Sequence, residues 1–170
     1  LAAGGGTRMK SKTMKVLHHV GGRSMVGHVL TAVQAMEPTR VVAVIGHQRE
    51  GVAVHIQEYL PDCPLAVQEE LNGTGGAVRV AVEAAGISSG TVVVAGGDTP
   101  LLEGASLRLF AQEHQAAERA VSVLTGVVAN PFGSGRIVRG EDGDLVAIVE
   151  EKDATDDERA FLRRLNDERN

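Results

Sequence analysis

The sequence is poor in aromatic residues, which make up 2% of its 170 residues and include no tryptophan. Hydrophobic residues nevertheless account for 43% of the chain, which is too many for a disordered polypeptide. The core must therefore be built from Val, Leu, Ile and Ala. Such a core, with 21 glycines in the chain, is typical of a parallel sheet whose strands are buried on both faces.

Cysteine is nearly absent as well. Cys63 is the only one, which excludes an internal disulfide framework and a cysteine-based metal site. His18, His28 and His47 fall on separate predicted elements and lack the spacing of metal ligands. We interpret them as structural histidines.

Neither a strongly basic segment nor a long apolar run is present. The net charge is -5, so the electrostatic footprint of a nucleic-acid-binding protein is missing. Single nucleotides remain compatible partners, because one loop can bind phosphate inside an acidic protein. No apolar run approaches the roughly 20 residues that span a bilayer, and no signal-peptide pattern is recognisable. We expect a cytoplasmic protein that does not insert into membranes.

Apolar strand-length runs alternate with helical periodicity along residues 1–128. The pattern predicts helices over residues 25–36 (with Ser24 as N-cap), 48–60, 74–85 (with Thr74 as cap) and 104–119, and strands over residues 40–45, 65–68, 91–95 and 120–128. Such alternation indicates βαβ units. We therefore predict an α/β fold with a Rossmann-like, mainly parallel open sheet.

The pattern changes after Asn130. Two short strands, residues 136–139 and 145–150, flank a turn at residues 141–144, which predicts a small added hairpin. A charged helix is expected from Thr155 onward. The sequence shows no internal repeat and no linker. We therefore interpret residues 1–170 as part of one domain that lacks the start of its first strand and its C-terminal part.

Three polar, glycine-rich segments follow predicted strands: residues 4–15, 68–74 and 96–100. Ligands of open α/β sheets sit beyond the carboxyl ends of the strands. Glycines let backbone amides surround an anion, while Arg8 and Lys15 can neutralise phosphate charge. Taken alone, the first segment also fits a flexible loop with ordinary surface cations.

Other nucleotide-binding loops are excluded by motif. The first segment has no Gly-Lys-Ser/Thr triplet, and it is not a Gly-x-Gly-x-x-Gly loop. Gly46-His47, with nothing acidic, follows the strand that ends at Ile45. This disfavours a dinucleotide-dependent oxidoreductase.

The first loop resembles the signature loop of the sugar-1-phosphate nucleotidyltransferases, through Leu1-Ala2-Ala3-Gly4, Gly6-Thr7-Arg8-Met9 and Lys15-Val16-Leu17. Further segments narrow the resemblance to the bacterial N-acetylglucosamine-1-phosphate uridylyltransferases, usually the front half of a bifunctional enzyme; they are residues 18–29, 72–75, 97–102, 131–137 and 148–155. The resemblance covers essentially the whole chain. It implies a fold of the nucleotide-diphospho-sugar transferase type.

The resemblance implies a reaction of UTP with N-acetylglucosamine 1-phosphate that depends on Mg²⁺, in a homo-oligomeric parent serving cell-wall precursor synthesis. It implies catalytic roles for Arg8 and Lys15 and a metal ligand at Asp98. The implied nucleotide-binding residues are Leu1, Ala2, Ala3, Gly4, Lys15, Gln68, Gly73, Thr74, Gly96, Gly97 and Asp98, and the implied sugar-binding residues are Gly135, Glu150 and Asn166.

The residue types fit these roles. A Gln amide offers both a donor and an acceptor to uracil, although Gln68 also suits the capping of a strand end. A carboxylate at Asp98 can hold Mg²⁺ whose other sites take phosphates and water, although an Asx-turn would use it as well. Glu150 can accept hydrogen bonds from sugar hydroxyls, or it can be a solvated charge at a strand end.

Several positions depart from the family pattern. Met14 replaces a usual Pro, Leu71 a usual Gln, Gly76 a usual His and Ser134 a usual aromatic; Gly96 and the region 156–170, with Asp167-Glu168 where a Gly is expected, also differ. These departures keep two alternatives open. One is a non-catalytic module that binds nucleotides or nucleotide sugars, and the other is a sibling transferase that uses another nucleotide or sugar phosphate.

Overall fold

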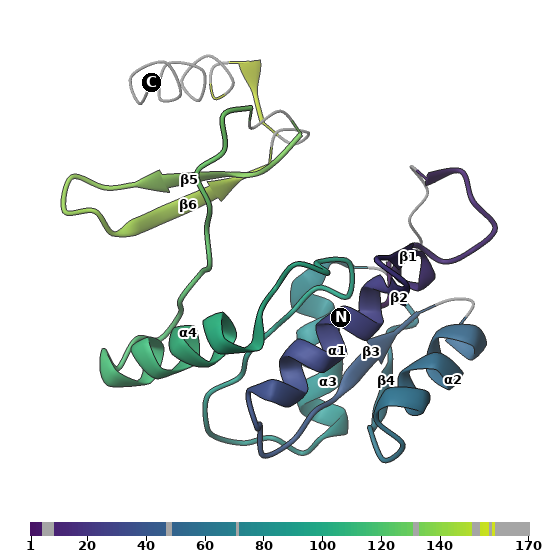
Figure 1. Cartoon of the computed structure of the whole chain (residues 1–170). Helices are drawn as coiled ribbons and strands as arrows, with labels where there is room; N and C mark the ends of the chain where they lie inside the picture. The colour runs from purple at the N-terminus through teal and green to yellow at the C-terminus, as the bar shows by residue number, and fades with distance from the viewer. Residues whose placement is uncertain are drawn as a thin grey trace. The chain divides into compact units, whose positions relative to one another are not determined.

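The computed structural model describes residues 1–4, 9–46, 49–70, 72–130, 133–150, 154–156 and 158 (Figure 1). The chain forms two compact units, Leu1–Ser122 and Val123–Asn170. Each unit is described by itself below.

A parallel arrangement of four segments forms the centre of the first unit. Strands β3 (Ala43–Ile45) and β4 (Leu65–Val67) pair in parallel, and Ala2 forms a parallel bridge with Ile45. On the other side, the Leu1 nitrogen donates to the Ala95 carbonyl at 2.7 Å, and the Gly97 N–H donates to the Leu1 carbonyl at 2.7 Å. The order across the sheet is therefore 95–97, 1–2, β3, β4, with all carboxyl ends at one edge.

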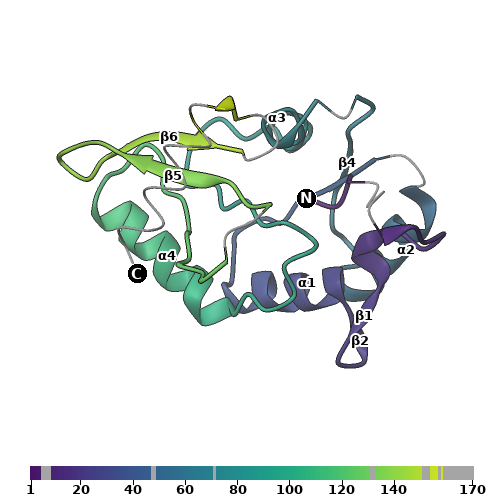
Figure 2. The same cartoon turned by 90° about the horizontal axis from the view of Figure 1, so that it is seen from above.

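Helices cover both faces of this sheet. The helices are α1 (Met25–Ala35), α2 (Arg49–Tyr59), α3 (Thr74–Ala84) and α4 (Gly104–Ala116). A short 3-10 helix (Lys15–Leu17) and a small antiparallel hairpin of β1 (His19–Val20) and β2 (Arg23–Ser24) precede α1. Figure 2 shows α1 and α2 on one side of β3 and β4, and α3 on the other.

The alternation of side chains along β3 divides the core into two clusters. Ala43 and Ile45 pack with residues of α1 and α2, among them Leu30 and Ile56. Val44, which has no exposed surface, packs on the opposite face with Ala3, Ala66 and Ala77. This is the aliphatic, doubly buried core that the composition predicts.

Helix positions follow the sequence prediction closely. Ser24 is the N-cap of α1, and its hydroxyl accepts from the Gly27 N–H at 3.0 Å. The helices predicted over 25–36, 48–60 and 74–85 are confirmed to within one residue at each end, whereas the one predicted over 104–119 ends at Ala116. The prediction of Thr74 as a cap was wrong: Thr74 is already helical, and Gly73, with φ of +91°, is the N-cap.

Two predicted strands are wrong, and a third is shorter than expected. The strand expected over 40–45 begins at Ala43. Residues 91–95 and 120–128, all within the described part of the chain, form no strand. Val92 and Val94 stay 47% and 46% exposed, and Val127 is 96% exposed. A strand needs a neighbouring backbone to satisfy its N–H and C=O groups, and pairing beside residues 91–95 begins only at Ala95, through Leu1.

The second unit contains the predicted hairpin. Strands β5 (Arg136–Arg139) and β6 (Leu145–Val149) pair antiparallel, with Arg136 opposite Val149. In the turn, the Gly140 N–H donates to the Asp144 carbonyl at 2.9 Å, and Gly143 adopts φ of +83°, a conformation that glycine adopts without a steric penalty. The hairpin prediction is confirmed.

A capping box begins the predicted C-terminal helix. The Thr155 hydroxyl accepts from the Glu158 N–H at 3.2 Å, and the Glu158 carboxylate accepts from the Thr155 N–H at 2.8 Å. The remainder of that helix lies outside the described residues.

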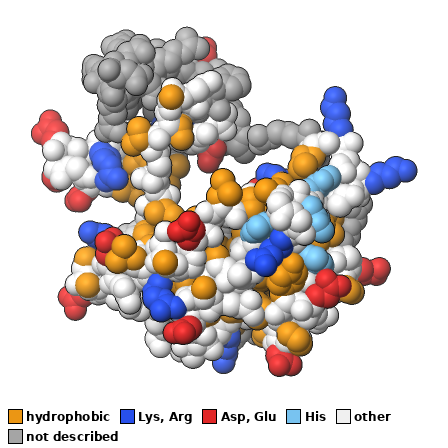
Figure 3. All heavy atoms as spheres, viewed as in Figure 1, with side chains coloured by type: hydrophobic (Ala, Val, Ile, Leu, Met, Phe, Trp, Pro, Cys, Tyr) orange, Lys and Arg blue, Asp and Glu red, His pale blue; other side chains and the backbone are white. Residues whose placement is uncertain are grey.

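The surface in Figure 3 carries basic and acidic side chains interspersed, without a large area of one sign. Within the described residues, no helix is long and apolar enough to cross a membrane.

Candidate active site

The parallel order of the central segments brings the predicted nucleotide-binding residues of the first unit to one edge. Gly4 follows the first segment, Gln68 follows β4, and Asp98 follows the segment 95–97 that pairs with Leu1. Leu1, Ala2 and Ala3 lie within the sheet, and Ala2 and Ala3 are only 5% and 7% exposed. The side chains of Ala2 and Ala3 are therefore not accessible to a ligand.

Lys15 and Asp98 form an ion pair at this edge, although 83 residues separate them. The Lys15 Nζ lies 2.6 Å from Asp98 Oδ2, and the two side chains are 38% and 40% exposed. The hydrogen bond from Lys15, against a smaller opposing effect of burial, holds the pKa of the Asp98 carboxyl below its ordinary range. The site thus presents an ionised carboxylate and an accessible ammonium side by side.

Buried neighbours position both members of this pair. Val16, next to Lys15, is 3% exposed and belongs to the core cluster of α1 and α2. Asp98 follows Gly97, whose backbone bonds to Leu1. A Cβ on Gly97 would come within 3.0 Å of the Leu1 carbonyl oxygen and 3.3 Å of a Val16 methyl. Glycine at this position therefore lets the Asp98 turn approach the segment that carries Lys15.

Gln68 is held inside the loop that it begins. Its side chain is 4% exposed, and its backbone N–H donates to the Ile45 carbonyl at 2.8 Å. The side-chain Nε2 donates to Asn72 Oδ1 at 3.0 Å and to the Gly73 carbonyl at 3.1 Å. Gln68 therefore ties the end of β4 to the residues just before α3. Thr74, the first residue of α3, is exposed.

The donor set at this edge suits magnesium better than a transition metal. Within the described residues, no group of three or more His, Cys, Asp or Glu side chains could hold a metal ion. Asp98 offers this edge an ionised carboxylate whose side chain is 40% exposed. Mg²⁺ is usually held by one or two carboxylates together with phosphate oxygens and water, so Asp98 fits this ion when a polyphosphate is present.

Gly135 and Glu150 lie together in the second unit. The hairpin register places Gly135 opposite Glu150, and a Cβ on Gly135 would come within 3.2 Å of Glu150 Oε1. The structure thus brings together two of the three residues predicted to bind the sugar. Asn166, the third, and Arg8, the predicted cation of the first loop, lie outside the described residues.

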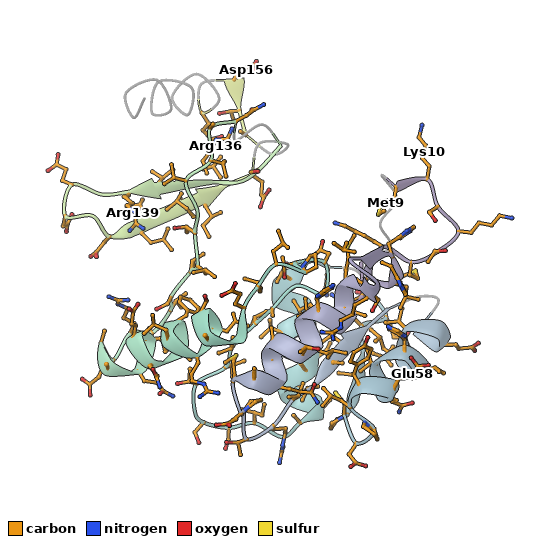
Figure 4. The ribbon with its side chains drawn as sticks, in the orientation of Figure 1. Met9, Lys10, Glu58, Arg136, Arg139 and Asp156 are labelled. Carbon is orange, nitrogen blue, oxygen red and sulfur yellow. The ribbon has the colours of Figure 1, made fainter. Side chains whose placement is uncertain are left out.

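Sequence reasoning missed a side-chain network between α1 and α2. His55 bonds to Ser24 Oγ through Nε2 at 2.6 Å and to Glu58 through Nδ1 at 2.9 Å. His55 and Glu58 border an open hollow of about 480 Å³ that also includes Leu17, His19 and Glu50, and Glu58 projects from α2 in Figure 4. Ser24 is 1% exposed and already caps α1, so the network is structural. No spacing in the sequence signals it.

The comparisons agree with the geometry. Residues 1–168 match the model of the MobA-like NTP transferase domain. The chain is 54% identical over 168 residues to the Bifunctional protein GlmU of Streptomyces coelicolor (98% of this chain, 35% of the relative). Proteins of the same name from Thermobifida fusca and Pseudarthrobacter chlorophenolicus are 51% identical over 164 residues (94% and 34%) and 48% identical over 169 residues (98% and 34%).

The chain spans about a third of the length of these curated relatives. The family match covers residues 1–168, and the structure places the Lys15 ammonium and the Asp98 carboxylate together at the carboxyl edge of the parallel segments. The chain belongs to the family of MobA-like NTP transferase domains.

Proposed function

We propose that the chain is part of a uridylyltransferase domain that transfers the uridylyl group of UTP to N-acetylglucosamine 1-phosphate. The products are UDP-N-acetylglucosamine, a precursor of peptidoglycan and lipopolysaccharide, and pyrophosphate. The observation that carries the proposal is the Lys15–Asp98 pair, 2.6 Å apart, at the edge it shares with Gly4 and Gln68. The relatives named Bifunctional protein GlmU support it independently.

The reaction needs charge neutralisation more than proton transfer. An oxygen of the sugar phosphate attacks the α-phosphorus of UTP, and the bond to the pyrophosphate leaving group breaks. That oxygen is already ionised, so no general base is required. Two polyanions must instead be held in line, with their charge compensated in the transition state. In our proposal Lys15 and Arg8 supply positive charge, and the amide of Gly4 binds a phosphate oxygen.

Asp98 is the proposed ligand of Mg²⁺. When bound, the ion would neutralise phosphate charge and help to orient the phosphates. The lowered pKa of Asp98 keeps its carboxylate ionised at neutral pH. In the structure Lys15 already bonds to Asp98 Oδ2, so ligand binding would redirect the Lys15 ammonium from Asp98 toward phosphate.

The remaining proposed roles concern the base and the sugar. Gln68, Gly73 and Thr74 would bind uracil, with the polar turn of Gly96 and Gly97 supporting the nucleotide. Gly135 and Glu150, which adjoin each other across the hairpin, would bind the amino sugar together with Asn166. We further propose that the protein works in the cytoplasm as a homo-oligomer.

A nucleotide-specific assay tests the proposal. Pyrophosphate release by the full-length protein is measured with N-acetylglucosamine 1-phosphate, Mg²⁺ and either UTP, CTP or GTP. We expect turnover with UTP. Turnover only with CTP or GTP would indicate a sibling transferase. UTP binding without turnover and without dependence on magnesium, measured by calorimetry, would indicate a non-catalytic nucleotide-binding module.

A further inference from the structure

We propose that Asn72 is a positioning residue that fixes the orientation of the Gln68 amide and so favours uracil over cytosine. The inference rests on the proposed function, because it assumes that Gln68 meets the base. It concerns a contact that lies entirely within the first unit, between the end of β4 and the first turn of α3.

The contact uses both hydrogens of the Gln68 amide. Nε2 donates to Asn72 Oδ1 at 3.0 Å and to the Gly73 carbonyl at 3.1 Å. With both acceptors on the same side, the amide nitrogen faces the loop and the carbonyl oxygen Oε1 faces the opposite way. The reverse orientation would set Oε1 against two oxygen acceptors and leave two donors without partners, which is unfavourable for a side chain that is 4% exposed.

Gly76 makes room for this arrangement. An added Cβ on Gly76 would collide with the Asn72 side-chain oxygen. A Cβ on Gly75, its neighbour in the first turn of α3, would have nothing within 4 Å. Asn72 thus occupies the space that a side chain at position 76 would fill. The glycine that departs from the family pattern at position 76 and the Asn at position 72 are parts of one contact.

A fixed acceptor at Gln68 distinguishes the two pyrimidines at ring position N3. Uracil carries a hydrogen on N3 and can donate it to Oε1, whereas the N3 of cytosine is an acceptor and would be left facing another acceptor. An amide that is free to turn offers either group and loses this discrimination. Sites built around one buried hydrogen-bond partner reject a mismatched group strongly.

The experiment measures the affinity of the full-length protein for UTP and for CTP by calorimetry in the presence of Mg²⁺. Asn72→Leu removes the acceptor and keeps a similar size, and Asn72→Asp retains an acceptor oxygen.

A second pair of variants changes the space that Asn72 occupies. Gly76→Ala displaces Asn72 while placing a good helix former in α3, and Gly75→Ala is its matched control. We expect the preference for UTP to fall about tenfold in Asn72→Leu and Gly76→Ala. Asn72→Asp and Gly75→Ala should keep it.

A spectroscopic readout separates positioning from general loss of stability. In the wild-type chain without nucleotide, the Gln68 side-chain amide hydrogens should exchange slowly with solvent, as seen by NMR, and Asn72→Leu should accelerate this exchange. An unchanged preference for UTP in both Asn72→Leu and Gly76→Ala would overturn the role of Asn72 and leave the proposed function standing. A wild-type chain that binds UTP no better than CTP would contradict the proposed function and this inference together.

Discussion

Lys15 and Asp98 show how partly exposed side chains are given a defined position. Each side chain is close to 40% exposed. However, Asp98 follows Gly97, whose backbone bonds to Leu1, and Lys15 precedes Val16, which is packed in the core. Because exposed ion pairs contribute little to stability, this pair has room to rearrange when a polyphosphate and its counter-ion arrive. We therefore propose that the pair serves ligand binding rather than folding.

Asp98→Asn tests this distinction. It should lower turnover with UTP by at least about a hundredfold, because it removes a charged metal ligand, while the free energy of unfolding changes by less than about 1 kcal/mol. Steady-state assays and urea denaturation measure the two quantities. Asp62→Asn, an exposed change in the loop before β4 and thus at the opposite edge of the sheet, is the control. Near-normal magnesium-dependent turnover in Asp98→Asn would refute the metal assignment.

The pH dependence of stability provides a second residue-scale test. Since the pKa of Asp98 in the folded chain lies below its ordinary value of 3.8, its contribution is fully present above that value and is lost as the pH falls through the lowered pKa. The stability difference between wild type and Asp98→Asn should therefore be constant at neutral pH and shrink below about pH 4. Urea denaturation of both proteins at each pH measures this difference. A difference in the free energy of unfolding that grows on acidification would contradict the ion pair.

At the scale of elements, backbone segments lie in close contact at the carboxyl edge of the sheet. A Cβ on Gly46 would come within 2.7 Å of the Ala3 carbonyl oxygen. Gly46→Ala should therefore destabilise the chain by about 1–3 kcal/mol, since backbone has to move in a packed core. Gly51→Ala in α2, whose Cβ would meet only a Leu17 methyl at 3.9 Å, should instead stabilise it by about 0.5–1 kcal/mol. Chemical denaturation measures both free energies of unfolding. Equal changes for the two variants would contradict the close approach of Gly46 to the Ala3 backbone.

Met14 precedes the short helix of Lys15 with φ of -55°, which lies within the range of proline. Met14 thus already adopts the φ that a proline at this position would impose. Met14→Pro should be more stable than Met14→Ala by about 0.4–1 kcal/mol, because both lose the methionine side chain and only proline restricts the unfolded chain. Urea denaturation of the two variants measures this. A less stable proline variant would mean that the preceding loop cannot accommodate the ring.

Helices were predictable because their signals are local. Ser24 lies directly before the apolar periodicity of α1 and caps it as expected. Strands were harder, since apolar composition at residues 91–95 and 120–128 does not provide a pairing partner. The placement of the candidate residues Gly4, Gln68 and Asp98 at the carboxyl ends of the parallel segments was predictable, but their contacts were not. The pairing of Lys15 with Asp98 and the use of both Gln68 donors within the loop depend on tertiary geometry.

At the scale of the whole molecule, the proposed substrates divide between the two compact units. The residues proposed to bind the nucleotide lie in the first unit, Leu1–Ser122, and Gly135 and Glu150, proposed to bind the sugar, lie in the second, Val123–Asn170. This division predicts that nucleotide binding depends on the first unit and sugar selectivity on the hairpin of the second.

An NMR titration of the isotope-labelled chain with UTP and Mg²⁺ measures most directly where the polyphosphate binds. The largest changes in chemical shift should fall on Gly4, Lys15, Gln68, Gly73 and Asp98. Changes confined to the hollow bordered by His19, His55 and Glu58, or to the β5–β6 hairpin, would show that the carboxyl edge of the sheet is not the nucleotide site.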